Sequence, residues 1–361
     1  MTLPAKTAAR AEAARLMAHF RDHGAEEVEA QVLQPAAELL DLYGEDIRAR
    51  AYVTQDPIRG EMMLRPDFTV PVVRMHMEAG LDPARYAYAG EVFRRQEDDP
   101  LRPYEYLQAG FELLGGADPA GADAEVFAVL LSALPDLRLR AEIGDIGILV
   151  AAVQGLRTTE SRKAALVRHI WRPRRFRALL DRYAGRVPLP ERRVALLATA
   201  DPFAEAGPEI GLRTRAEIEA RIAMLRENEA APPISEEEVA TIDAILSIDA
   251  PAPRALDALR GIGARAIGPA LDRLARRLDA LDRRGIALNG LAFEGSFGRT
   301  TLEYYDGFVF GLSAEDRPDL PPVATGGRYD ALTRVLGRGR AVPAVGGVIR
   351  PELVVQLRGK P

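Results

Sequence analysis

The chain has 361 residues, a length that indicates two or three domains. Its 47% hydrophobic and 28% charged residues are typical of a globular protein in water. The net charge of −5 disfavours a broad nucleic-acid-binding surface, because such surfaces carry a basic excess. Cysteine is absent, which excludes disulfide bonds, thiolate catalysis and cysteine-based zinc sites.

The amino-terminal residues do not resemble a signal peptide, since Lys6 and Arg10 precede no apolar run of the required length. No apolar run approaches ~18 residues, so we expect no membrane span and a cytoplasmic protein. Among the histidines, only His19 and His23 have a spacing that suits a metal, and they lie in a segment of mixed polarity. We therefore expect no metal site.

Residues 1–64 combine helical and strand patterns. The expected elements are an amphipathic helix over residues 4–23 that Gly24 ends, a strand over 28–33, a helix over 36–43 preceded by Pro35, and a hairpin with strands 52–54 and 62–64.

The run LRPDFT follows this hairpin and places Arg65, Asp67 and Thr69 within five residues at the end of a strand. An arginine, an acid and a hydroxyl so close together suit a ligand with an amino group. The alternative is that Asp67 only caps the start of a helix over residues 69–79. The sequence leaves both interpretations open.

Residues 86–116 predict two strands joined by a charged connector over 96–103. Period-two alternation places Gln108 and Glu112 on the same face of the second strand, beside the open backbone of Gly110, while the apolar side chains face a core. Arg94 of the first strand can point to the same side. This surface suits a small zwitterion or a phosphate.

Residues 120–134 predict a helix and residues 137–148 a strand. From residue 158 to 284 the chain is rich in Arg, Ala and Leu and is broken by prolines, which indicates a mostly helical insertion. The basic run over residues 172–177 is interpreted as a solvated helical face rather than a nucleic-acid patch, because acidic residues surround it.

Strand patterns return after residue 285. We expect strands over residues 286–293, 302–312 and 344–349, a helix N-terminus at residues 326–330 that can hold an anion, and a final helix from Pro351. The pattern predicts an α+β fold around one antiparallel sheet, in which residues 1–157 and 285–361 form the core and 158–284 an insertion domain.

Taken in order, the hairpin, LRPDFT, LEYYDGFVF, GGRYD and PAVGG resemble the core of class II aminoacyl-tRNA synthetases, and among these histidyl-tRNA synthetase. The resemblance covers roughly residues 10–155 and 285–355. It implies that Arg94 lies where the family contacts the ATP α-phosphate, and that Asp67 and Thr69 lie where it binds the α-amino group of histidine. The remaining histidine-contacting positions that it implies are Gln108, Glu112, Tyr304 and Tyr305.

The chain departs from the synthetase pattern at its ATP-binding positions. Thr300 stands where the family has an arginine, with Arg299 one place away, and Leu353 replaces the arginine of the closing motif, in which Arg350 replaces a glycine. Gln96 and Tyr104 replace further polar residues of the second motif. Only 15 residues follow Gly346, so we also expect no anticodon-binding domain.

A synthetase core without ATP chemistry is similar to the regulatory subunits of ATP phosphoribosyltransferase. That resemblance implies a protein with no catalytic residues and no cofactor, which activates a short catalytic subunit and helps confer feedback inhibition by histidine. It also implies a homodimer, formed around residues 28–43, within a hetero-oligomer. From the net charge and the lack of a long apolar run we expect neither a nucleic-acid nor a membrane partner.

Two alternatives remain open at this stage. A divergent histidine-adenylating ligase would use Arg94, Arg95 and Arg102. A histidine-binding dimer without an enzyme partner is the other. The polar residues at the histidine positions can also be a hydrogen-bonded core with no ligand.

Overall fold

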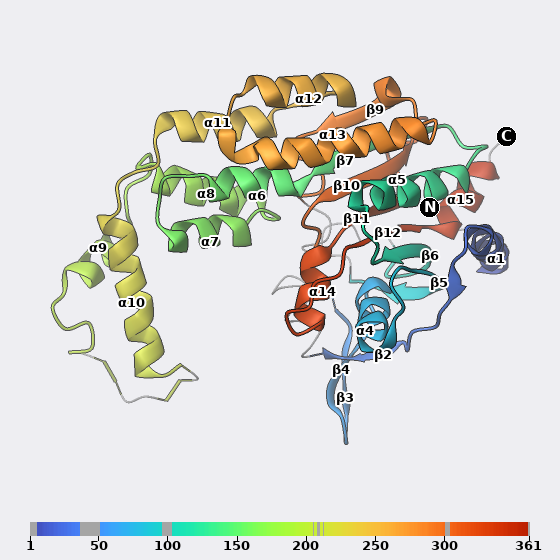
Figure 1. The fold of residues 1–361 in the computed structure, drawn as a ribbon. Helices are drawn as coiled ribbons and strands as arrows, with labels where there is room; N and C mark the ends of the chain where they lie inside the picture. The colour runs from blue at the N-terminus through green and yellow to red at the C-terminus, as the bar shows by residue number, and fades with distance from the viewer. Residues whose placement is uncertain are drawn as a thin grey trace.

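The computed structural model describes residues 6–36, 51–95, 103–204, 206–207, 210–211, 213–299 and 304–359. Figure 1 shows one large sheet with helices packed along it and a helical arm that projects at the left of the view, next to α8 (Pro173–Tyr183) and α11 (Glu236–Leu246). A smaller sheet of three strands lies at the lower edge.

The large sheet has nine strands in the order β1-β5-β6-β12-β11-β10-β7-β9-β8. All neighbours are antiparallel except β1 with β5 and β7 with β9, which are parallel. The strands are β1 Glu26–Glu27, β5 Ala84–Phe93, β6 Glu105–Leu114, β7 Leu139–Asp145, β8 Asp249–Pro251, β9 Leu291–Glu294, β10 Phe308–Ala314, β11 Ala324–Arg328 and β12 Ala344–Ile349. The α+β class and the mainly antiparallel sheet predicted from the sequence are confirmed.

The small sheet contains the predicted hairpin, with β3 Val53–Asp56 antiparallel to β4 Gly60–Leu64. Its third strand is β2 Leu33–Pro35. The strand predicted over residues 28–33 is wrong, because after β1 only the Val28 amide bonds to the large sheet, at Ala87, and the chain then crosses to the small sheet. Most of the helix predicted over residues 36–43 lies outside the described residues, and Pro35 ends a strand.

Helices outside residues 158–284 pack on the large sheet. They are α1 Lys6–Asp22, α4 Thr69–Ala79, α5 Pro119–Ser132, α6 Ile146–Gln154, α14 Asp330–Leu336 and α15 Pro351–Arg358. Helix α1 buries Leu16, Met17 and Phe20 on one face, as its apolar spacing predicts, and is followed by Gly24 at a φ of 81°. Asp145 ends β7 because its carboxylate caps α6 by accepting from the Gly147 amide, so the strand predicted to residue 148 stops earlier.

Residues 158–284 are mainly helical, as predicted. The helices are α7 Glu160–Arg168, α8 Pro173–Tyr183, α9 Glu191–Ala198, α10 Arg215–Ala230, α11 Glu236–Leu246, α12 Ala252–Gly261 and α13 Gly268–Arg283. Capping boxes at Thr214 and Ser235 start α10 and α11. Helices α9 and α10 form the projecting arm, whereas α13 packs along α5 and β8 joins the large sheet. The proposed division into a core and an insertion domain stays a prediction.

The carboxy-terminal segment differs from the prediction in several places. The strand predicted over residues 286–293 begins only at Leu291, after a short 3-10 helix at Leu288–Gly290. Strand β10 starts at Phe308, so Tyr304 and Tyr305 precede it instead of alternating along it, and Leu302 lies outside the described residues. Gly326 and Gly327 lie within β11, where a Cβ on Gly326 would approach Phe310 to 2.3 Å, so these glycines allow close strand packing rather than a helix turn.

The N-terminus of α14 holds an anion that belongs to the chain itself. The Asp306 carboxylate accepts hydrogen bonds from the amides of Asp330 at 3.1 Å and Ala331 at 2.6 Å. Burial, followed by the charge of Asp330, raises the pKa of Asp306 to about 6. The predicted role of this N-terminus in binding an external anion is therefore wrong.

Candidate ligand-binding site

Glu112 is the centre of a buried polar cluster on β6. Its carboxylate accepts hydrogen bonds from the Thr69 hydroxyl at 3.0 Å, from the Tyr88 hydroxyl at 2.7 Å and from the Tyr329 hydroxyl. These donors come from α4, from β5 and from the link between β11 and α14. A carboxylate has about four lone-pair positions, so one remains for a further donor.

Glycines on the neighbouring strands make room for this cluster. Gly346 of β12 lies opposite Glu112, and a Cβ there would come within 1.4 Å of the Glu112 carboxylate. Gly110 lies opposite Tyr88, and its Cβ would come within 2.2 Å of the tyrosine ring. The cluster therefore depends on glycine at both positions, since any larger residue must displace a polar side chain.

Gly346→Ala is expected to lower the free energy of unfolding by about 1–3 kcal/mol, because the added methyl overlaps the Glu112 carboxylate. Gly290→Ala is the matched control, since nothing lies within 4 Å of a Cβ there. Urea unfolding of the two variants provides the measurement. Equal stability of both would contradict the placement of Glu112.

Burial dominates the electrostatics of the cluster. It raises the pKa of Glu112 to about 7, although the hydrogen bonds from Tyr329, Tyr88 and Thr69 act in the opposite direction. Burial, reinforced by the negative charge of Glu112, also raises the pKa values of Tyr88, Tyr305 and Tyr329. The tyrosine hydroxyls therefore stay protonated and act as donors near neutral pH.

Asp67 and Arg94 lie beside one another at the edge of the cluster. Asp67 is buried, and its carboxylate lies 3.8 Å from the Arg94 guanidinium, whose Nε donates to the Pro66 carbonyl at 2.7 Å. The N-cap position of α4 is Phe68, so the alternative in which Asp67 caps this helix is wrong. Arg65 is buried against the Phe68 ring and donates to the Glu91 carbonyl at 2.8 Å, which gives it a structural role.

Tyr304 and Tyr305 border the Glu112 cluster next to Tyr329. Their rings are 4.9 Å apart, and the Tyr304 ring lies 5.9 Å from that of Tyr329. The charges of Glu112, Asp67 and Arg94 all act on the Tyr305 hydroxyl. The structure thus brings together most of the residues predicted from the sequence: Asp67, Thr69, Arg94, Glu112, Tyr304 and Tyr305.

Gln108 lies on the same face of β6 as Glu112 and is 2% exposed. Its Oε1 is buried and has no hydrogen-bond partner among the residues that the structure describes. Four residues along a strand span about 13 Å, so Gln108 and Glu112 can contact opposite ends of one ligand rather than the same ring.

Tyr88 and Tyr329 are the residues of the cluster that the sequence analysis missed. Both are fully buried and donate to Glu112. Tyr88 alternates with Gly90 in a predicted strand, and Tyr329 belongs to the GGRYD motif. The sequence patterns therefore included both tyrosines. Their common hydrogen-bond acceptor, Glu112, follows only from the order of the strands in the sheet.

The arginines near the ATP-binding positions contact other parts of the chain. Arg299 donates to the Ile170 carbonyl at 2.9 Å and stacks over the Phe176 ring, toward the helical segment. Arg350 donates to the Pro322 carbonyl at 2.7 Å, and Leu353 is buried in α15. Thr300 and Gln96 lie outside the described residues.

Within the described ranges, no cluster of three or more histidine, aspartate or glutamate side chains is placed to hold a metal ion. His19 and His23 instead bond to the carbonyls of Val129, at 3.1 Å, and of His19, at 2.8 Å. No helix in this part of the chain combines the length and apolar character that a membrane span requires.

Known proteins with this fold include synthetases and their relatives. The chain matches the histidyl-tRNA synthetase family model over residues 2–227 and 215–354. A solved ATP phosphoribosyltransferase regulatory subunit/histidyl-tRNA synthetase from Bacillus halodurans C aligns with a TM-score of 0.71 at 19% identity, covering 100% of this chain and 82% of that one. A histidine–tRNA ligase subunit from Alicyclobacillus acidocaldarius gives 0.62 at 24% identity, covering 99% and 95%. The fold is that of histidyl-tRNA synthetase-like class II proteins.

Proteins of similar sequence identify one family within this fold class. The ATP phosphoribosyltransferase regulatory subunit of Brucella ovis is 34% identical over 359 residues, covering 93% of this chain and 94% of that protein. Its counterpart in Brucella melitensis biotype 1 is also 34% identical, with 93% of each chain covered. The chain belongs to the family of ATP phosphoribosyltransferase regulatory subunits, which confirms the family that the sequence motifs indicated.

Proposed function

We propose that this chain is a non-catalytic regulatory subunit in histidine biosynthesis, which binds and activates a short-form ATP phosphoribosyltransferase in the cytoplasm. The observation that carries the proposal is the 34% identity to curated regulatory subunits over 93% of the chain. The chain acts as a homodimer within a hetero-oligomer. Co-elution with the short catalytic subunit on size exclusion is the first expected result, and separate elution of the two proteins would count against the proposal.

The proposed effector is histidine, held in the cluster around Glu112. The remaining acceptor position of Glu112 suits an imidazole N–H, and Asp67 suits the ammonium group. The buried Oε1 of Gln108 offers a further acceptor, which supports a ligand rather than a closed polar core. If histidine binds one state of the complex more tightly, a coupling of ~1–3 kcal/mol shifts the complex toward that state and inhibits the partner.

Glu112→Ala is expected to weaken histidine binding by about tenfold or more, because it removes a hydrogen-bonding carboxyl group from a buried site. Isothermal titration of the isolated chain measures this change. Glu105→Ala is the control, since Glu105 pairs with Lys6 at the surface. An unchanged titration for Glu112→Ala would show that histidine does not bind at this cluster.

A divergent histidine-adenylating ligase is the second candidate. It is favoured by Arg94, which lies beside the candidate histidine site at 3.8 Å from Asp67. Histidine-dependent exchange between ATP and pyrophosphate separates the two candidates. We expect no exchange by the pure chain, and robust exchange would replace the regulatory proposal with the ligase.

A further inference from the structure

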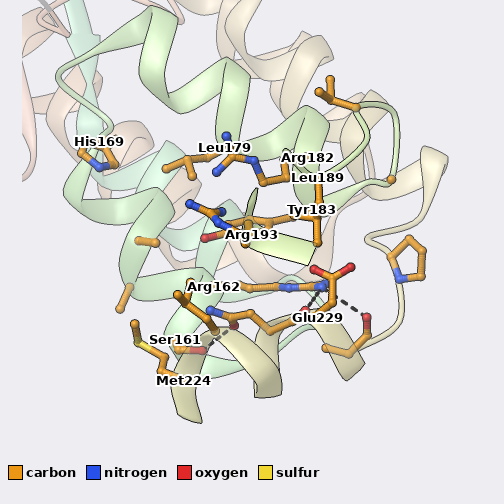
Figure 2. A pocket seen from close by; sticks show the side chains of 18 of the residues that line it. Ser161, Arg162, His169, Leu179, Arg182, Tyr183, Leu189, Arg193, Met224 and Glu229 are labelled. Carbon is orange, nitrogen blue, oxygen red and sulfur yellow. Dashed lines mark hydrogen bonds between the residues drawn. The ribbon is translucent and has the colours of Figure 1, made fainter. Parts of the chain in front are cut away.

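A cavity lies within the helical segment, away from the Glu112 cluster. It is bounded by α7, α8, the link from α8 to α9, the start of α9, and α10, and has a volume of about 520 Å³. Small-molecule sites in proteins commonly measure about 300–1,000 Å³. Figure 2 shows Arg182, Tyr183, Arg193 and Arg162 arranged across this cavity, with Leu179 and Leu189 at its upper side.

The lining of the cavity is strongly basic. It contains the arginines Arg162, Arg168, Arg182, Arg193 and Arg221, whereas Glu229 is its only acidic residue. This concentration of positive charge occurs in a chain whose net charge is −5. Such a cavity attracts anions, because its low-dielectric walls focus the field of the arginines.

Arg162 has a structural role in this lining. Its guanidinium donates to the carbonyls of Asn228, Pro232 at 2.8 Å and Ala231 at 3.2 Å, and stacks over the Tyr183 ring. It thereby joins α7 to the end of α10 and fixes one wall of the cavity.

The other lining arginines are available to a ligand. Within the described part of the chain, none of Arg168, Arg182, Arg193 and Arg221 forms an ion pair with a carboxylate. The Nε of Arg182 is buried and has no hydrogen-bond partner there. This donor can therefore bond to an acceptor supplied from outside the chain.

The electrostatics of Tyr183 show that the arginines act on a common region. Burial raises the pKa of this phenol, while the positive charges of Arg162, Arg182, Arg221 and Arg193 act to lower it. The cavity also contains apolar surface from Leu179, Leu189 and Met224. A suitable ligand is therefore compact, carries several negative charges, and has an apolar or ring-shaped portion.

We propose that this cavity binds a small organic polyanion, a phosphate ester or a polycarboxylate, through Arg182 and Arg193, whose planar guanidinium groups can each bind two oxygens. Tyr183 and the apolar wall contact the rest of the molecule. The enclosure by helices on several sides favours a small molecule over an extended nucleic acid or an acidic protein segment. The inference goes beyond the proposed regulatory function and does not depend on it.

Isothermal titration of the full chain with ATP, pyrophosphate and citrate, each at low and at physiological salt, tests the site. We expect saturable binding of at least one probe, weaker at higher salt. The Arg182→Ala/Arg193→Ala double variant is expected to weaken that binding by about tenfold or more, since it removes two charged donors. Binding of ATP and pyrophosphate alone would identify a phosphate site, and binding of citrate alone would identify a carboxylate site.

Arg175→Ala is the matched control, because Arg175 is an exposed residue of the same helix and does not line the cavity. If the double variant does not fold, the single variant Arg193→Glu replaces it, because Arg193 is partly exposed and its substitution is expected to preserve the fold. This variant must also weaken binding of the probe. No binding of any probe at millimolar concentration would overturn the proposal. So would equal binding by wild type and Arg193→Glu, or binding of a short RNA duplex in place of all three small anions.

Discussion

Arg277→Met is expected to lower the free energy of unfolding by about 3–5 kcal/mol, because it removes a buried cation that two buried carboxylates share. Among the described residues, Asp123 then keeps only its ion pair with Arg328, and Asp145 keeps only the hydrogen bond from the Gly147 amide. Arg277 of α13 donates from Nε to Asp123 of α5 at 2.6 Å and from Nη1 to Asp145 of β7 at 2.7 Å. All three side chains are nearly inaccessible to solvent. The ion pairs thus fix the last helix of the 158–284 segment to the synthetase-like sheet.

The control for this prediction is Arg276→Met, since Arg276 is the exposed neighbour of Arg277 on the same helix. Urea unfolding of both variants measures the difference. A loss for Arg277→Met no larger than that for Arg276→Met would show that the buried cluster does not hold α13 to the sheet.

The second large effect concerns pH and Glu112. Burial raises the pKa of Glu112 from 4.5 to about 7, so the folded state favours the protonated form. The stabilising contribution of Glu112 is fully present below its pKa in the unfolded state. It is lost as the pH rises through its pKa in the folded state. Between about pH 5 and pH 8, Glu112 is expected to lower the free energy of unfolding by about 2–3 kcal/mol.

Glu112→Gln isolates this contribution, because the amide keeps the volume of the side chain and does not titrate. The pKa of Asp306 is raised to about 6, so its contribution to the free energy of unfolding is lost over a lower pH range. Because Asp306 is present in both proteins, this contribution cancels in the comparison. Urea unfolding of wild type and variant at the two pH values gives the difference. Parallel pH profiles for the two proteins would contradict the raised pKa of Glu112.

Part of the site around Glu112 could be predicted from the sequence, because local patterns determine which side chains lie near one another. Alternation along one strand placed Gln108 and Glu112 on a single face, and the LRPDFT run placed Asp67 and Thr69 near one another. Tyr88 and Tyr329 were missed because their common partner depends on the pairing of β6 with β5 and β12, which join distant parts of the chain. Tyr304 and Tyr305 were placed in a strand, but the chain turns there before β10 begins.

The arginine-lined cavity could not be predicted from the sequence either. Its residues come from α7, α8, α9 and α10, and each helix separately has the composition of a solvated helix. Only their packing shows that Arg182 and Arg193 face the same cavity (Figure 2). Charge composition therefore indicated the absence of a broad basic surface, but it could not detect a local concentration of positive charge.

The turnover of a short-form ATP phosphoribosyltransferase, measured with and without this chain and with and without histidine, tests the central claim most directly. We expect the stoichiometric chain to raise turnover and to make it sensitive to histidine. Turnover that is unchanged by the chain, at concentrations where both proteins are folded, would contradict its assignment as the activating regulatory subunit.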